Sequence, residues 1–150
     1  KNKEDLAFAS FKYNVTSVVD KIKLSMEGIE SGLEQLHALM NFYRTYRSHT
    51  IEMGGCPIIN IGVDANHQNP ALLERVQEVV AKLQGYIQRM IELGQSQHEI
   101  HKNISAEKYA KKIFAFIEGS IFMTVTMNDD SYINEMMNHV DALINRELKK

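Results

Sequence analysis

Apolar residues recur at intervals of three and four along most of this chain, the spacing that places them on one face of an α-helix. Five stretches follow the pattern, and we predict helices over residues 2–26, 31–49, 69–94, 105–127 and 131–148. Between the second and third stretches lies a segment rich in glycine and proline, which favours turns. Residues 58–63 are apolar, but we find no second strand to pair with them, so we predict a partly buried connector with a short helical turn.

Polar residues at the ends of the stretches support these boundaries. A short oxygen-bearing side chain before a helix can accept a hydrogen bond from a free backbone N–H of its first turn. The candidates are Asn2, Ser31 in an S-x-x-E capping box with Glu34, Asn69 before Pro70, and Ser105. Gly94 is the expected end of the third helix.

The stretch 105–127 differs from the others because its apolar residues do not stay on one face. One stripe is Tyr109, Ile113, Phe116, Ser120 and Met123, and a second, which we expect roughly opposite, is Ala110, Phe114, Ile117, Ile121 and Thr124. A helix that is apolar all round is buried on all sides. In a chain of this size one face meets the domain's own core, and we expect the other to meet a second molecule.

The last stretch also carries two apolar stripes, which are too broad for a helix resting on one neighbour. We therefore expect an all-α, antiparallel bundle of about five main helices that dimerises through its last two. The alternative is that these are ordinary core positions of a monomer. The expected dimer interface consists of Phe114, Ile117, Ile121, Thr124, Ile133, Met137, Val140 and Ile144.

Composition narrows the class of protein. The 150 residues suit one domain, and 17 basic against 19 acidic residues give a formal charge of -2, which neither attracts nor repels nucleic acid. The single cysteine excludes an internal disulfide and fits a cytoplasmic location. The longest apolar run, 113–127, contains Glu118 and is shorter than the ~20 residues that cross a bilayer, so we expect no membrane partner. The sequence begins KNKEDL, and we expect it to be a piece of a longer protein.

Motifs for metal or catalytic chemistry are weak. Glu34 and His37 have the E-x-x-H spacing of di-iron bundles, but that site needs a second copy and two further glutamates that we do not find. His98 and His101 lie in a polar linker without a Cys or Asp to complete a zinc set. Cys56 has no base or positive charge beside it in sequence, which favours a small buried residue over a nucleophile. We therefore predict no enzyme activity, no metal and no cofactor.

Aromatic and methionine side chains lie on four of the predicted helices. Such side chains fill a core as readily as they line an adaptable apolar cavity with phenolic hydroxyls to orient a ligand, and the residues alone leave both open. The candidate ligand-binding residues are Phe11, Tyr43, Tyr46, Cys56, Tyr86, Met90, Phe116 and Met123.

Three short motifs resemble the tetracycline-repressor-type (TetR/AcrR) family of transcriptional regulators. The opening KNKEDL resembles the junction after the recognition helix of that family. Gly55-Cys56-Pro57 resembles the turn after the second ligand-domain helix, and Ala110 with Glu118-Gly119 resembles the dimerising helix. The motifs occur in the family's order and span most of the chain.

The resemblance implies that residues 1–150 are the effector-binding and dimerisation domain of a homodimeric, ligand-responsive regulator, in the form of a repressor. It implies a small apolar or amphipathic effector. It also implies that operator DNA is bound only through an N-terminal helix-turn-helix domain absent from this chain. The effector would displace the first helix and so alter the spacing of the two DNA-binding domains. The alternatives are a helical interaction scaffold and a metal-binding bundle without DNA function.

Overall fold

The computed structural model describes residues 3–50 and 56–150, and within these ranges the chain folds into seven α-helices and a closing π-helical turn. This confirms the predicted all-α class. The α-helices are α1 (Lys3–Ser25), α2 (Gly32–Arg44), α3 (Tyr46–Thr50), α4 (Pro57–Gln68), α5 (Pro70–Ser96), α6 (Ala106–Met127) and α7 (Ser131–Leu143), and the π-helical turn is Ile144–Leu148.

Three of the predicted helix caps are confirmed by their hydrogen bonds. Ser31 Oγ accepts from the backbone N–H of Glu34 at 3.1 Å and begins α2. Asn69 Oδ1 accepts from Leu72 N at 3.0 Å and begins α5, and Ser105 Oγ accepts from Lys108 N at 3.3 Å and begins α6. The fourth candidate, Asn2, lies outside the described residues.

Two predicted boundaries are wrong. The segment 58–63 is part of the 12-residue helix α4, because Pro57 stands at its first position, where the fixed φ of proline favours a helix. Gly94 does not end α5, which continues to Ser96. The chain turns only after that, and His98 takes a positive φ of 64°.

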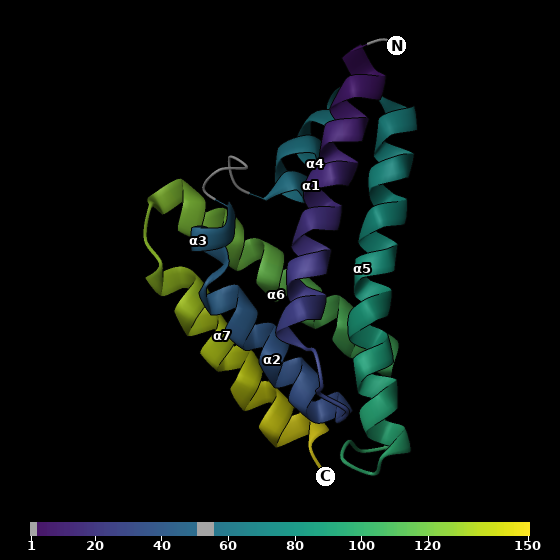
Figure 1. Cartoon of the computed structure of the whole chain (residues 1–150), viewed down its shortest axis with the longest axis vertical. Coiled ribbons are helices and arrows are strands. Elements are labelled where there is room, and N and C mark those ends of the chain that lie inside the picture. Colours follow the sequence, from purple (N-terminus) through teal and green to yellow (C-terminus); the bar gives the residue numbers. More distant parts are fainter. Residues whose placement is uncertain (1–2, 51–55) are drawn as a thin grey trace.

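Four helices form the main core. Helix α6 packs against α5 and α7, and α2 contacts the same two helices (Figure 1). Helices α1 and α4 pack on one another, with α1 also against α2 and α4 against α5. The most deeply buried side chains of the core include Leu36, Met40, Ile91, Ile113, Ile117, Met137 and Val140.

One end of the bundle is closed by backbone contacts, and we call it the closed end. A Cβ atom on Gly32 would overlap the backbone of α5 at Gly94 N and Met90 O, so α2 and α5 meet here without an intervening side chain. Gln97 accepts from Gly32 N at 2.9 Å and donates to Glu30 O at 2.8 Å. The C-terminus pairs with the loop after α5, where His101 N donates to Leu148 O at 2.9 Å.

Polar contacts hold α7 against α2. The Asp141 carboxylate binds the His37 ring at 2.7 Å and the Arg44 guanidinium at 2.5 Å. His37 is therefore engaged in a hydrogen bond between helices. Among the described residues, no group of three or more His, Cys, Asp or Glu side chains is arranged to hold a metal ion.

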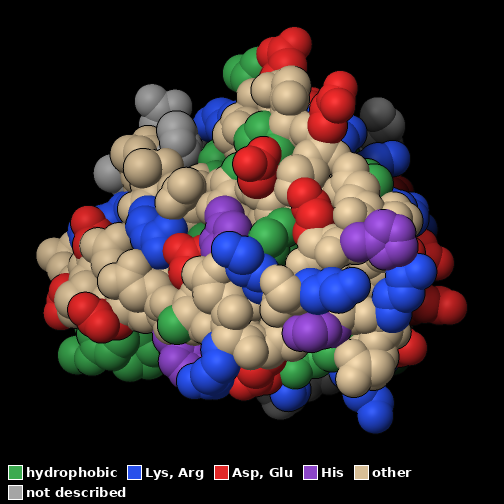
Figure 2. All heavy atoms as spheres, turned by 90° about the horizontal axis from the view of Figure 1, so that it is seen from below, with side chains coloured by type: hydrophobic (Ala, Val, Ile, Leu, Met, Phe, Trp, Pro, Cys, Tyr) green, Lys and Arg blue, Asp and Glu red, His purple; other side chains and the backbone are tan. Residues whose placement is uncertain are grey.

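Seen from below, the molecule shows acidic, basic and histidine side chains interspersed (Figure 2). Both signs therefore share this face. No helix within residues 3–50 and 56–150 combines the length and apolar character that crossing a bilayer requires.

Candidate effector-binding site

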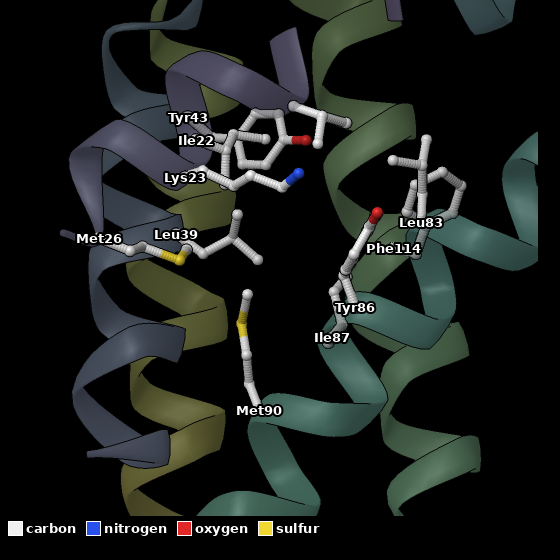
Figure 3. A pocket seen from close by; sticks show the side chains of 11 residues that line it. Ile22, Lys23, Met26, Leu39, Tyr43, Leu83, Tyr86, Ile87, Met90 and Phe114 are labelled. Carbon is white, nitrogen blue, oxygen red and sulfur yellow. The ribbon is translucent and has the colours of Figure 1, made fainter. Parts of the chain in front are cut away.

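An apolar cavity lies between α1, α2, α5 and α6 (Figure 3). Its volume is about 70 Å³, which holds water-sized molecules but is smaller than the ~150 Å³ cavity that takes up benzene in an engineered protein. Met26, in the turn just after α1, and Met90 of α5 reach into it (Figure 3). A larger ligand would have to widen this space. The lining residues are Val19, Ile22, Lys23, Met26, Leu39, Tyr43, Leu83, Tyr86, Ile87, Met90 and Phe114.

A second, smaller cavity of about 30 Å³ adjoins the first toward the start of α4. The two spaces are adjacent because Val19, Ile22, Tyr43 and Leu83 line both. Its other lining residues are Val15, Val18, Tyr46, Cys56, Pro57, Ile58 and Glu118. The combined site is therefore apolar at one end and carries a carboxyl group, a thiol and phenols at the other.

Glu118 occupies the polar end of this site. Its carboxyl group accepts a hydrogen bond from the Cys56 thiol, with 3.1 Å between Sγ and Oε2. Burial raises the pKa of Glu118 to about 7, and the bond from Cys56 opposes this only in part. The side chain therefore changes charge near neutral pH.

The surroundings of Cys56 do not favour a nucleophilic thiolate. Cys56 precedes the first turn of α4, and both burial and the neighbouring Glu118 raise the pKa of its thiol well above the ordinary value. A nucleophilic cysteine needs the opposite shift. The thiol also forms a hydrogen bond with Tyr46, and burial raises the pKa of this phenol as well.

Aromatic rings surround the polar end. The ring centroids of Tyr43 and Tyr46 lie 5.3 Å apart, and Phe42 packs edge-on against Tyr43 at 5.5 Å. The Tyr43 hydroxyl points into the cavity (Figure 3). At the outer rim, Lys23 Nζ lies 5.9 Å from the ring centroid of Tyr86.

Five of the eight candidate ligand-binding residues line the two cavities: Tyr43, Tyr46, Cys56, Tyr86 and Met90. The other three lie outside both cavities. Phe11 packs against Phe8, nearer the start of α1. Phe116 packs edge-on against the ring of His139 on α7 at 5.7 Å, and Met123 lies two turns further along the same face of α6.

The expected dimer interface is corrected. Phe114, Thr124, Ile133 and the other five residues are buried inside the single chain, and Phe114 lines the larger cavity. Successive helix residues are about 100° apart, so the two stripes on α6 are about a quarter turn apart and not opposite. Both stripes are buried or half-buried within the single chain, and the exposed face of α6 is formed by other residues, among them Ala115, Gly119 and Phe122.

The ligand-binding residues predicted from the sequence do not include Glu118, Leu83 or Phe114, which line the cavities. A signal for Glu118 was present, because it is the one charged residue between Lys112 and Asp129 in an otherwise apolar stretch. A lone charge in a buried helix usually has a partner or a function. Leu83 and Phe114 are apolar residues on apolar faces, and only the packing of the helices distinguishes them from core residues.

Comparison with known proteins identifies the fold and the family. The family of tetracyclin repressor-like C-terminal domains matches residues 32–140. A TetR transcriptional regulator from Chloroflexus aurantiacus J-10-FL is 25% identical, with a TM-score of 0.91 over 99% of this chain and 75% of its own. A TetR-family regulator from Cytophaga hutchinsonii shares the fold at 22% identity, with a TM-score of 0.87 over 99% of this chain and 74% of its own. No curated protein matches significantly. The chain belongs to the tetracyclin repressor-like C-terminal domains, and thus to the TetR family of transcriptional regulators.

Proposed function

We propose that this chain is the sensor part of a ligand-responsive repressor, in which a small apolar or amphipathic effector binds the two adjoining cavities. The observation that carries the proposal is the position of the cavities between α1 and the helices α2, α5 and α6. Ligand sites in proteins are typically mostly apolar, with a few polar groups that orient the ligand. Glu118, Cys56, Tyr43 and Tyr46 would supply these groups.

Effector binding would move α1. The cavities are smaller than a drug-sized ligand requires, so one wall must shift on binding. Among the described side chains of α1, Phe11 and Val18 are the buried ones, so displacing this helix uncovers less apolar surface than displacing α6. Val19 is 16 residues, or about 24 Å, from Lys3, and a tilt of about 5° would move Lys3 by about 2 Å.

The start of α1 is where the resemblance places the junction to a DNA-binding domain. We propose that such a domain precedes Lys1 in the full-length protein and that the shift of α1 changes the distance between two operator-binding heads. A preference of the effector for one α1 position would lower operator affinity by the coupling free energy, typically ~1 to 3 kcal/mol. A regulator that binds operator DNA would act in the cytoplasm.

A single introduced tryptophan tests effector entry, because the chain has no tryptophan of its own. Tyr86 lines the cavity and Tyr132 lies on α7, yet both are 38% exposed. We expect an effector to change the fluorescence of Tyr86→Trp while the matched Tyr132→Trp control stays constant. The full-length protein should then release its operator DNA over the same concentration range. A ligand that alters Tyr86→Trp but leaves operator affinity unchanged would refute the coupling.

We further propose that two chains pair through the outer face of α6 and α7, formed by Ala115, Gly119, Phe122 and His139. These residues are exposed in the single chain, and Phe122 is 49% exposed. A Cβ added to Gly119 would meet no neighbouring atom within 4 Å, so a helix from a partner could approach closely here. TetR-family regulators are dimeric as a class, which supports this kind of partner.

Sedimentation velocity tests the outer face. Phe122→Glu puts a charge in the proposed interface, and Leu24→Glu makes the same kind of change at an exposed position of α1. We expect a dimer for the unmodified chain and for Leu24→Glu, and a monomer for Phe122→Glu. If Phe122→Glu remains as dimeric as the control, the interface lies elsewhere.

A further inference from the structure

The second cavity contains a carboxyl group without a cationic partner. Among the described residues, the ion pairs do not include Glu118, and its hydrogen bond comes from the Cys56 thiol. A thiol is a weak donor and supplies no positive charge. Val15, Val18, Val19, Ile22 and Leu83 form the surrounding apolar wall. An ionised carboxylate in such surroundings is costly unless a cation pairs with it.

We propose that the effector is a cationic amphiphile, an amine or quaternary ammonium compound with an apolar tail, and that the Glu118 carboxylate receives its cationic group. This inference rests on the proposed effector-binding function. It adds the chemical class of the ligand and the residue that selects it.

The aromatic groups at the polar end suit the same ligand. The Tyr43 and Tyr46 rings lie next to one another and line the cavity that contains Glu118. Aromatic rings attract ammonium groups through the negative charge of their faces, most strongly where water is excluded. The Tyr43 hydroxyl, which points into the cavity, can accept a hydrogen bond from an N–H group of the ligand (Figure 3).

The first cavity suits the tail. Leu39, Ile87 and Phe114 form apolar walls, and Met26 and Met90 can change rotamer to fit chains of different shape. Because the two cavities adjoin at Val19, Ile22, Tyr43 and Leu83, one molecule can occupy both. A head at Glu118 and a tail beside Met90 would press on the second half of α1 from within.

An anionic amphiphile fits the site less well. Lys23 is the basic residue among those that line the two cavities. It lies exposed at the rim, where water screens its charge. An anionic head placed there would leave Glu118 unpaired. An anionic head placed deeper would meet the Glu118 carboxylate directly.

Of the ionisable groups that line the second cavity, Glu118 is the one that changes charge near neutral pH. The others are the Cys56 thiol at the start of α4, the Tyr43 phenol from α2 and the Tyr46 phenol from α3, while α1 and α5 present apolar side chains. Burial holds the pKa values of the thiol and both phenols far above neutral, so they stay uncharged. A cationic ligand should therefore bind more weakly at about pH 6 than at about pH 8, because it must first displace the proton of Glu118.

The test compares octylammonium, 1-octanol and octanoate, each below its micellar concentration, by calorimetric titration of the chain at about pH 8. We expect octylammonium to bind about tenfold or more tightly than octanol. Glu118→Gln should abolish this preference, so that octylammonium binds no more tightly than octanol to the variant. Glu107→Gln, which removes an exposed carboxylate of the same helix, is the matched control and should keep the preference.

Several outcomes would overturn the inference. Equal affinity for octylammonium and octanol, tighter binding of octanoate, or an unchanged preference in Glu118→Gln would each do so. In these cases octanol or octanoate binding, reported by Tyr86→Trp, would leave the proposed effector site intact. If none of the three probes binds, the cavity and its selectivity fail together. Should Glu118→Gln not fold, the comparison of octylammonium with octanol at about pH 6 and about pH 8 in the unmodified chain decides the matter.

Discussion

Glu118→Gln should make the ligand-free chain more stable above neutral pH. Burial raises the pKa of Glu118 from 4.5 to about 7 in the folded state. The folded protein thus holds this proton more tightly than the unfolded chain does. The free energy of unfolding that this bound proton contributes is fully present below about pH 4.5. It falls as the pH rises to about 7, where the folded protein also loses the proton. Glutamine does not ionise, so the stability of Glu118→Gln does not fall with pH for this reason.

The size of the effect follows from the two pKa values. Each pKa unit corresponds to ~1.4 kcal/mol, so the whole difference is worth about 3 kcal/mol. Part of this difference develops below about pH 5, where Glu118 is already ionised in some of the unfolded chains. We therefore expect the stability of Glu118→Gln relative to the unmodified chain to grow by about 2 to 3 kcal/mol between about pH 5 and about pH 8.

Urea unfolding followed by far-UV circular dichroism across this pH range measures the difference directly. Other titrating groups are common to both proteins and cancel when distant from Glu118. Glu107→Gln, at an exposed site, should run parallel to the unmodified chain. If Glu118→Gln also ran parallel, Glu118 would not be a buried carboxyl group with a raised pKa, and the electrostatic argument for a cationic ligand would fail with it.

Three further variants test the packing by urea unfolding. Gly32→Ala should destabilise the chain by about 3 kcal/mol, because the added Cβ overlaps α5 backbone that cannot rotate away. Gly85→Ala, where the added Cβ would touch the flexible Arg89 side chain, should instead stabilise it by about 0.5 to 1 kcal/mol, and similar effects at both sites would contradict the close approach of α2 and α5. Thr124→Val should stabilise by about 1 kcal/mol, because the Thr124 hydroxyl is buried without a partner in the described structure, and a loss of stability would reveal an unseen one. Asp141→Asn should cost about 1 to 2 kcal/mol by weakening its contacts with His37 and Arg44 on α2, and an unchanged midpoint would show that these contacts do not stabilise the fold.

Local chemistry made the helix starts predictable from the sequence. Ser31, Asn69 and Ser105 act through atoms within three residues, so no knowledge of the fold was needed to place them. The end of α5 was mispredicted at Gly94 for the opposite reason. That glycine serves a distant contact, since its position near Gly32 and Ile100 leaves no room for a side chain.

The sequence predicted which faces of α6 are apolar, but not what covers them. Periodicity identifies apolar stripes such as the one through Phe114 and Ile117, but it does not say which neighbour covers them. The structure shows the chain's own core on that stripe. The same limit explains the binding site, where Tyr43, Tyr86 and Met90 were identified by residue type, while Leu83 was not.

The closed end of the bundle is held together by several contacts between distant segments. Three kinds of contact lie at this end: the glycine backbone contact between α2 and α5, the Gln97 hydrogen bonds and the pairing of the C-terminal segment. The start of α1 lies at the opposite end (Figure 1). A ligand that separates α1 from the other helices would therefore displace the start of α1 more easily than the closed end. If an effector binds as proposed, widening of the two cavities would be such a separation, and Lys3 would move more than the closed end.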